Sequence, residues 1–167
     1  MKKSDELVQI AAKTGEILLD RGWRLAAVES CTGGWIAQTV TSLAGSSDWF
    51  ECGLVTYSNA SKESLVGVPG SMISRYGAVS AEVAEAMVSG VLQRTGAHAA
   101  VSVTGIAGPG GGSDEKPVGT VYIAWQFPGI DTVSERFHFH GDRDEVRRQS
   151  VLTAFSELVR LIQTVPA

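Results

Sequence analysis

The sequence lacks an excess of basic residues, a long apolar run and enough cysteines to form a disulfide framework. Its 167 residues carry 14 Lys and Arg against 18 Asp and Glu, so the formal net charge is −4 and the pI is near 5.3. Such a chain offers no positive field to a polyanion such as DNA, and no apolar run approaches the roughly 18 residues that a membrane span requires. We therefore expect neither a nucleic-acid partner nor a membrane partner.

Cysteine and histidine are both scarce. Cys31 and Cys52 are the two cysteines, and the charged start of the chain does not resemble a secretory signal. His98 stands alone, and His138 and His140 have no cysteine or carboxylate at ligand spacing around them. These features predict a reducing, cytoplasmic location and a site that uses neither a metal nor another cofactor.

Glycine is abundant, with 19 residues, and the excess is local. Five glycines lie between positions 105 and 112, at the start of a segment 105–119 that follows an apolar run. Loops of this length inside compact domains are usually functional or disordered. The segment has neither the Gly-Lys-Ser/Thr ending of a P-loop nor the spacing of a dinucleotide fingerprint. Two interpretations stay open: a backbone cradle for a phosphate or ribose, and a mobile loop.

Apolar residues alternate between helical and strand spacing along the chain. The pattern predicts helices over 4–22, 35–45, 60–65, 71–76, 81–96 and 142–162, and strands over 24–29, 49–57, 99–104, 118–127 and 132–140. The last two strands flank a turn at Pro128-Gly129 and are expected to pair antiparallel. The sequence thus predicts one domain over residues 1–167, a three-layer α/β/α fold with a mixed, mainly parallel sheet and an antiparallel strand pair.

The stretch 28–34, Val-Glu-Ser-Cys-Thr-Gly-Gly, concentrates more chemistry than any other part of the chain. A strand that ends at Glu29 places the next residues at the carboxyl edge of a sheet, where open α/β folds bind ligands. The N–H groups of the helix that follows would then face a ligand. Ser30, Cys31 and Thr32 are all candidate nucleophiles or donors, and an equally weighted alternative is a structural turn capped by Ser30 or Thr32.

Other candidate residues have plain structural explanations. Tyr57 and Lys62 flank a second strand-to-helix turn, and a lysine with a lowered pKa can act as the base for a serine, although most lone lysines on short helices are solvated. Cys31 is a rival nucleophile because a thiolate at a helix N-terminus is activated. Arg143 and Arg147, near the start of the last helix, are explained by salt bridges unless an anion binds there.

Seven short motifs stand in order across nearly the whole chain. They are Glu29-Ser-Cys-Thr-Gly-Gly34, Gly45-Ser-Ser47 with Trp49-Phe50, Gly53-Leu-Val-Thr-Tyr-Ser-Asn59 with Lys62, Gly77-Ala-Val-Ser80, Val103-Thr-Gly-Ile-Ala-Gly-Pro109, Lys116-Pro-Val-Gly-Thr120 and Gly141-Asp-Arg143. Together they resemble the CinA C-terminal domain family. The chain has no counterpart of the N-terminal molybdopterin-binding-like domain of full CinA proteins, so it resembles the stand-alone members, which are nicotinamide-mononucleotide deamidases.

The resemblance implies hydrolysis of the carboxamide of nicotinamide mononucleotide to nicotinate mononucleotide and ammonia, without a metal, in pyridine-nucleotide salvage. The small-molecule partner would be this pyridine nucleotide. The resemblance also implies that Ser30 is the nucleophile, Lys62 the base that activates it, and Tyr57 a hydrogen-bonding partner in the same pocket. Ser47 is a second serine in a family motif and stays open as the nucleophile or as a substrate contact.

Substrate contacts follow from the same resemblance. It assigns Thr32, Gly33 and Gly34 to the oxyanion or phosphate side, Thr104, Gly105 and the following loop to the lining of the nucleotide site, and Arg143 or Arg147 to the phosphate. The substrate is cationic at its pyridinium ring, and we hypothesise that Asp114 or Glu115 meets that charge.

Three further questions stay open at the level of sequence. The chain could be a nucleotide-binding regulatory module without turnover, or a cysteine-dependent hydrolase that uses Cys31. Trp49, Phe50 and Trp125 are apolar residues whose exposure would favour a homodimer, and on that basis we expect a homo-oligomer.

Overall fold

The computed structural model describes the backbone of residues 3–166 and the side chains of residues 6–166. Its elements are α1 (Lys3–Asp20), β1 (Leu25–Glu29), α2 (Trp35–Thr41), the 3-10 turn η1 (Ser46–Asp48), β2 (Phe50–Val55), α3 (Asn59–Val66), α4 (Gly70–Tyr76), α5 (Ala81–Arg94), β3 (Ala99–Gly105), β4 (Thr120–Gln126), β5 (Val133–His138) and α6 (Arg143–Gln163). The predicted helices and strands are present in the predicted order, with ends that differ by a few residues.

The strands form one five-stranded sheet with the order β2-β1-β3-β4-β5. β1 pairs in parallel with β2 and with β3. β4 is antiparallel to both β3 and β5. β1, β2, β3 and β5 therefore run in one direction and β4 in the other, which confirms the predicted mixed sheet and its antiparallel pair.

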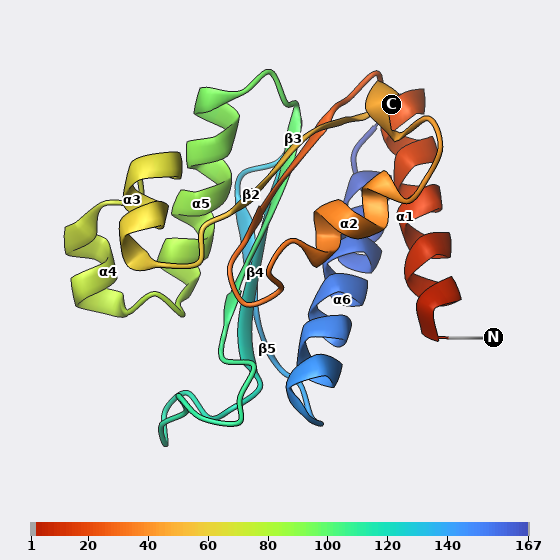
Figure 1. Ribbon diagram of the computed structural model, residues 1–167. Helices are drawn as coiled ribbons and strands as arrows, with labels where there is room; N and C mark the ends of the chain where they lie inside the picture. Colours follow the sequence, from red (N-terminus) through yellow and green to blue (C-terminus); the bar gives the residue numbers. More distant parts are fainter. Residues whose placement is uncertain (1–2, 167) are drawn as a thin grey trace.

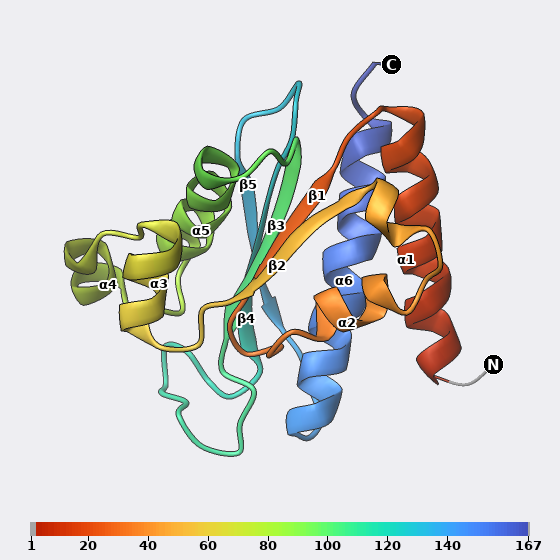
Figure 2. The same ribbon diagram turned by 45° about the horizontal axis from the view of Figure 1, so that its top comes forward.

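Helices cover both faces of the sheet. Figures 1 and 2 show α1, α2 and α6 on one face and α3, α4 and α5 on the other. All five residues of β1 are buried, and their side chains alternate between two apolar clusters. Leu25 and Ala27 join the cluster beneath α1 and α6, whereas Ala26 and Val28 join the cluster beneath α5. This arrangement confirms the three-layer fold, because a strand covered on both faces is apolar on both faces.

The carboxyl ends of the three parallel strands meet at one edge of the sheet. Glu29 of β1 is level with Val55 of β2 and Val103 of β3. The segments that follow these strands therefore emerge side by side. In Figure 1 this edge is the lower end of the sheet, and the loop of residues 106–119 extends below it.

Trp49 and Trp125 lie in the core and not on the surface. Their exposed fractions are 4% and 1%, and the Trp125 indole N–H donates to the carbonyl of Ala154 in α6 at 2.9 Å. Phe50 is partly buried against the same core. The expected apolar dimer surface made of these residues is therefore wrong, because packing between the sheet and its helices already covers them.

Over the described part of the chain, no helix combines the length and the apolar character needed to cross a membrane.

Candidate active site

Ser30 and Lys62 meet at the carboxyl edge of the sheet. Ser30 directly follows β1, and Lys62 lies on α3, which begins shortly after β2. Lys62 Nζ lies 3.0 Å from Ser30 Oγ. The exposed fraction is 8% for Ser30 and 1% for Lys62. Lys62 is therefore not the solvated surface residue that its place on a short helix favours, but a buried amine next to a buried hydroxyl.

Main-chain carbonyls surround the Lys62 amine. Nζ donates to the Thr56 carbonyl at 2.7 Å and lies 3.5 Å from the Tyr57 carbonyl. Ser58 caps α3 through a capping box with Ser61, which fixes the start of the helix that carries the lysine. Because burial removes the ammonium from water, it lowers the pKa of Lys62 from its ordinary value of 10.5. Nζ also donates to Ser30 Oγ, and loss of one proton from the amine would leave a lone pair able to accept the Ser30 hydroxyl proton.

Two glycines let the chain turn sharply from β1 into α2. Gly33 has a φ of 62° and Gly34 a φ of 97°, in the left-handed region where residues with a Cβ are strained. The Gly33 N–H donates to the Ser30 carbonyl at 3.1 Å and closes the turn. The resulting turn, residues 30–34, is the segment that presents Ser30, and we refer to it as the nucleophile turn.

The first N–H groups of α2 bind a carboxylate of the protein itself. Glu29 accepts hydrogen bonds from the N–H groups of Gly34 and Ile36 at 3.1 Å and from that of Ala37 at 3.0 Å. The Glu29 side chain is fully buried. The expectation that these N–H groups face a ligand is therefore wrong, because the Glu29 carboxylate already fills the N-terminus of α2.

Thr32, Gly33 and Gly34 do not lie on the pocket side of the turn. Thr32 is fully buried, and within the described chain its hydroxyl has no hydrogen-bond partner. Gly33 and Gly34 line a separate hollow together with Arg147. The structure thus does not bring these three residues to the oxyanion or phosphate side of a pocket next to Ser30. Their contribution is the shape of the turn.

A cavity of about 330 Å³ opens beside Ser30. Its lining includes six of the residues assigned to the site by the sequence: Ser30, Tyr57, Lys62, Thr104, Gly105 and Arg143. The backbone of the loop after β3 forms another wall, so this part of the glycine-rich segment does line a pocket. Three lining residues were missed by the sequence: Asn59, Ala78 and Val79. Asn59 could have been found because it lies between Tyr57 and Lys62 in the same motif.

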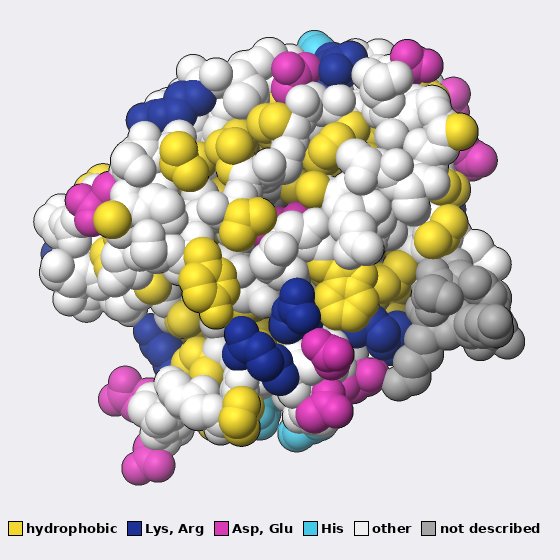
Figure 3. Space-filling model, in the orientation of Figure 1, with side chains coloured by type: hydrophobic (Ala, Val, Ile, Leu, Met, Phe, Trp, Pro, Cys, Tyr) yellow, Lys and Arg dark blue, Asp and Glu magenta, His cyan; other side chains and the backbone are white. Residues whose placement is uncertain are grey.

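The pocket is cationic. Lys62 and Arg143 contribute basic side chains to the lining, and the lining residues include no carboxylate within the described chain. Asp114 and Glu115 are exposed on the long loop, and Figure 3 shows the acidic side chains at its tip projecting away from the body of the molecule. The hypothesis that one of them meets the pyridinium is therefore wrong for this arrangement of the loop, which holds both side chains outside the lining.

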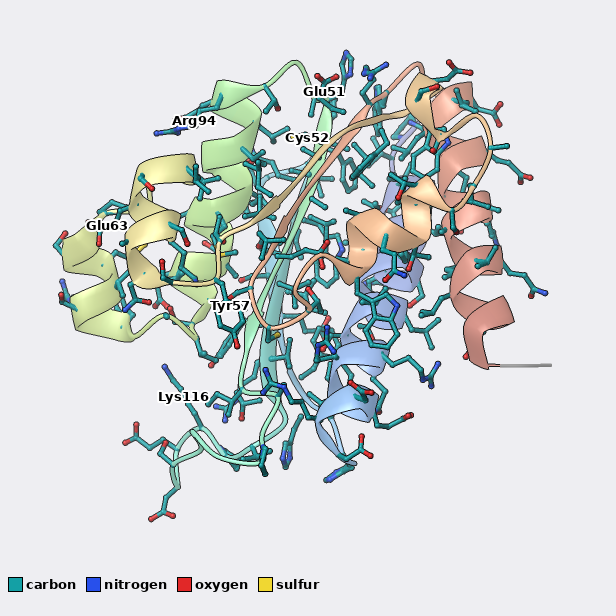
Figure 4. The ribbon with its side chains drawn as sticks, viewed as in Figure 1. Glu51, Cys52, Tyr57, Glu63, Arg94 and Lys116 are labelled. Carbon is teal, nitrogen blue, oxygen red and sulfur yellow. The ribbon has the colours of Figure 1, made fainter. Side chains whose placement is uncertain are left out.

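Tyr57 and Arg143 form the mouth of the pocket. The Tyr57 side chain is 63% exposed, and its hydroxyl accepts a hydrogen bond from Arg143 Nη2 at 3.3 Å. Arg143 Nη1 donates to the Gly108 carbonyl at 2.7 Å, which ties the first residue of α6 to the long loop. Figure 4 shows Tyr57 at the lower end of the sheet, above the loop that carries Lys116. The Lys116 amine in turn donates to the Tyr76 carbonyl of α4 at 2.9 Å.

Arg147 makes a different set of contacts from Arg143. Its Nε donates to the Cys31 carbonyl and its Nη2 to the Thr32 carbonyl, both at 3.1 Å. Its Nη1 forms an ion pair with Asp144 at 3.1 Å. The guanidinium therefore binds the back of the nucleophile turn, and of the two candidate arginines only Arg143 lines the pocket.

Ser47 lies at the opposite edge of the sheet from Ser30. It belongs to η1, which precedes β2, and its carbonyl accepts a hydrogen bond from Arg24 at 3.2 Å. Figure 4 shows Glu51 at the upper end of the sheet and Tyr57 at the lower end, so the start and the end of β2 are far apart. The structure does not bring Ser47 together with Ser30 and Lys62. The order of residues along the chain already predicts this separation. Ser47 precedes a parallel strand and so lies at the amino edge of the sheet, whereas Ser30 follows one and lies at the carboxyl edge.

Cys31 is a buried thiol with a raised pKa. Burial raises the pKa of Cys31 from its ordinary value of 9.0 to about 12, and the exposed fraction of the residue is 6%. The N-terminus of α2, which would have stabilised a thiolate, is occupied by Glu29. Cys31 is therefore neutral at physiological pH, and this argues against a cysteine nucleophile.

Over the described residues, no three His, Cys, Asp or Glu side chains form a group that could hold a metal ion.

Comparison with known proteins places this geometry in a family. Residues 7–162 match the CinA C-terminal domain. A Pseudomonas putida protein named nicotinamide-nucleotide amidohydrolase PncC is 50% identical over 157 residues, which cover 94% of this chain and 98% of the relative. A protein of the same name from Escherichia coli K12 is 47% identical, with 92% and 93% covered. The crystal structure of the competence/damage inducible protein CihA from Agrobacterium tumefaciens superposes with a TM-score of 0.90 at 39% identity, covering 93% of this chain and 95% of the other.

Proposed function

The chain belongs to the CinA C-terminal domain family, and we propose that it is a nicotinamide-nucleotide amidohydrolase that works through Ser30 and Lys62. The reaction converts nicotinamide mononucleotide and water to nicotinate mononucleotide and ammonia, a step of pyridine-nucleotide salvage. Relatives that the chain matches over nearly their full length carry this activity in their names. The observation that carries the mechanism is the buried lysine amine 3.0 Å from the serine hydroxyl in a pocket.

Lys62 is the base of the first step. Its neutral amine takes the proton of the Ser30 hydroxyl while Ser30 Oγ bonds to the carboxamide carbon, which gives a tetrahedral intermediate. Two features favour the neutral form of the amine. Within the described chain no carboxylate pairs with Lys62, and the substrate brings a second positive charge, the pyridinium, into the pocket.

The oxyanion of this intermediate needs donors other than the N-terminus of α2, which Glu29 occupies. The N–H groups of Cys31 and Thr32 donate to no main-chain or carboxylate oxygen within the described chain. Cys31 also lines the pocket and directly follows the nucleophile. We assign its N–H as an oxyanion donor, because the residue after a nucleophile commonly supplies one.

The intermediate collapses when the carbon–nitrogen bond breaks. The protonated Lys62 returns its proton to the leaving nitrogen, ammonia departs, and the acyl group stays on Ser30. A water molecule then attacks the acyl carbon, with Lys62 again accepting a proton. Cleavage of the ester bond to Ser30 returns that proton to Oγ and releases the carboxylic acid of nicotinate mononucleotide, so one water is consumed and one ammonia is formed. The acid then loses its proton to solvent, and ammonia takes up one proton as ammonium at neutral pH.

The remaining pocket residues bind the nucleotide. Arg143 lies at the mouth and supplies a guanidinium for the phosphate. Tyr57 offers a hydroxyl and an exposed ring beside it. Thr104 and Gly105 line the interior, where the Thr104 hydroxyl is already held by the Ala78 carbonyl at 2.7 Å. Thr104 thus shapes the wall more than it donates to the substrate.

The setting of the reaction follows from the chemistry of the substrate. We place the enzyme in the cytoplasm with a small pyridine nucleotide as its partner, and with no role for nucleic acid, membrane or a further cofactor. A homo-oligomer stays a prediction, and the mass of the purified protein from light scattering tests it.

The proposed function is tested by incubating the purified protein with nicotinamide mononucleotide, nicotinamide riboside or NAD and measuring ammonia and the acid product. We expect turnover of the mononucleotide, with much weaker turnover of the riboside because it has no phosphate for Arg143. Tight binding of the mononucleotide in calorimetry without release of ammonia would contradict the proposal. It would identify a regulatory nucleotide-binding module instead.

A further inference from the structure

We propose that Glu29 and Arg147 are positioning residues that hold the nucleophile turn from two sides and set the place of Ser30 without touching the substrate. We refer to this pair as the turn clamp. The proposal rests on the proposed function only in taking Ser30 as the nucleophile. Glu29 binds three N–H groups where the turn runs into α2, those of Gly34, Ile36 and Ala37. Arg147 binds two carbonyls of the turn itself, those of Cys31 and Thr32.

Glu29 binds the N–H side of the clamp. Its two carboxylate oxygens accept three hydrogen bonds, from Gly34, Ile36 and Ala37. The residue is fully buried and immediately precedes Ser30 in the chain. α2 has only seven residues, too few to be stable alone, and a carboxylate at its N-terminus is the favourable charge for the helix dipole. The start of α2, and with it the end of the nucleophile turn, is therefore fixed relative to β1 by Glu29.

Arg147 binds the carbonyl side of the clamp. Its planar guanidinium donates through two different nitrogens to the carbonyls of Cys31 and Thr32 at 3.1 Å, a geometry that suits the fixed fork of arginine and not the single amine of lysine. Asp144 holds a third nitrogen, and the guanidinium stacks over the Trp35 ring at 5.2 Å. These contacts orient the side chain before any substrate arrives.

The position of Arg147 on α6 links the clamp to the pocket. Arg143 and Arg147 are four residues apart, so they lie on the same face of the helix. Arg143 lines the cavity beside Ser30, whereas Arg147 lines a separate hollow with Gly33 and Gly34. One helix thus carries both the arginine that lines the pocket and the arginine that holds the turn.

Kinetics on matched variants of the full chain separate a positioning role from substrate binding. Arg147→Gln is expected to lower kcat roughly 10- to 100-fold and to leave KM within about twofold, because a small misplacement of the nucleophile slows chemistry without weakening binding. Arg147→Lys, which reaches one carbonyl, should recover part of kcat. Millimolar guanidinium ion should restore activity to Arg147→Ala, while sodium chloride at equal ionic strength should not.

Arg148→Gln is the matched control. Arg148 is the next residue of α6 and is more buried than Arg147, but it binds Glu6 and Glu145 and not the turn. The Arg148→Gln variant should lower the midpoint of thermal unfolding at least as much as Arg147→Gln does. Its kcat should stay within about twofold of the wild type. Equal losses of kcat in both variants would show that Arg147 has only a structural role. A rise in KM at constant kcat for Arg147→Gln would show that Arg147 contacts the substrate. Either result overturns the proposal for Arg147.

Glu29 is tested with Glu29→Gln and Glu29→Asp. The glutamine has one acceptor oxygen and an NH2 group that opposes an N–H donor, so we expect kcat to fall at least about 10-fold with KM unchanged. Glu29→Asp keeps the charge and should recover part of the loss. Wild-type kcat for Glu29→Gln would overturn the clamp. The wild-type enzyme is assayed in parallel: if it releases no ammonia the proposed function fails, whereas an active wild type with insensitive clamp variants refutes the clamp alone.

Discussion

Lys62 occupies an environment that is unusual for a lysine. Its side chain is 1% exposed, and its amine contacts two carbonyls and a hydroxyl but, within the described chain, no carboxylate. Burial without a counter-ion favours the neutral amine, which is the form that can accept a proton from Ser30. The same burial that disfavours the charge therefore creates the base.

The pH dependence of the reaction follows from this environment. Because burial lowers the pKa of Lys62, the amine loses its proton at a lower pH than the ordinary 10.5. We expect kcat/KM to rise with pH as Lys62 becomes neutral, with a midpoint below 10.5, and Lys62→Arg to be inactive throughout because a guanidinium keeps its proton. A profile from pH 5 to 10 measures this. A flat profile, or activity in Lys62→Arg, would contradict the assignment of Lys62 as the base.

The burial of Lys62 should also lower the free energy of unfolding of the protein. Its pKa is lower in the folded than in the unfolded chain, so between the two values the unfolded chain binds more protons, and stability rises with pH across that window. At pH 7 we expect Lys62→Met to raise the free energy of unfolding by roughly 1 kcal/mol and the melting temperature by about 2–4 °C. The gain should shrink toward pH 10.5, as the wild-type folded state loses its penalty.

Denaturant unfolding at pH 7 and pH 10 tests this stability effect. Lys13→Met is the control, because Lys13 is exposed on α1, and it should change stability by less than about 0.5 kcal/mol at both pH values. A destabilised Lys62→Met protein, or a gain that is the same at both pH values, would show that the buried ammonium is not penalised as described.

At the scale of the elements, the nucleophile turn depends on glycine backbone conformations. Gly34 has a φ of 97°, whereas Gly96, between α5 and β3, has no positive φ and open space around its Cα. We expect Gly34→Ala to destabilise the protein by about 1–2 kcal/mol and to lower kcat, because the alanine strains the turn that presents Ser30. Gly96→Ala should change both by little. Equal effects of the two substitutions on unfolding and turnover would contradict this account.

The elements also show what the sequence could and could not predict. The convergence of Ser30, Lys62 and Thr104 was predictable, because each lies at or just after the carboxyl end of a parallel strand or its following turn. The burial of the Lys62 amine was not, since a lysine on a short helix is usually solvated. Nor was the role of Glu29, because a glutamate at the end of a strand gives no sign that its carboxylate folds back onto the next helix.

The two arginines of α6 illustrate the same limit. Both stand at the start of a predicted helix, and only the packing of α6 against the nucleophile turn separates Arg143, at the pocket, from Arg147, behind the turn. The aromatic residues Trp49 and Trp125 were misjudged as exposed because their burial depends on α1 and α6, which cover the sheet from distant parts of the sequence. The position of a residue in the sequence, before or after a strand, determines at which edge of the sheet it lies. Its side-chain partners depend on tertiary packing.

At the scale of the whole molecule, an acidic protein carries a cationic pocket. The net charge is −4, yet the ionisable side chains in the described pocket lining are those of Lys62, Arg143, Tyr57 and Cys31, none of them a carboxylate. The pocket is assembled from the turns after β1, β2 and β3 and from the first residue of α6, so residues more than 110 positions apart meet there. This charge pattern suits an anionic small molecule.

The phosphate of the substrate should therefore interact with Arg143. We expect Arg143→Gln to raise KM for nicotinamide mononucleotide roughly 10- to 100-fold, which corresponds to the loss of a charge-assisted hydrogen bond. Turnover of nicotinamide riboside, which has no phosphate, should change by less than about threefold in the same variant. Steady-state kinetics with both substrates measure the difference, and an equal loss with both would place Arg143 elsewhere in the mechanism.

We propose Ser30, activated by Lys62, as the nucleophile of a carboxamide hydrolase. The most direct measurement compares ammonia release from nicotinamide mononucleotide by wild type, Ser30→Ala and Ser47→Ala, with folding checked by circular dichroism. We expect Ser30→Ala to lose at least about 1,000-fold in kcat, because the covalent step is removed, and Ser47→Ala to stay within about twofold of the wild type. Ammonia release near the wild-type rate by Ser30→Ala, or loss of activity in Ser47→Ala alone, would contradict the account.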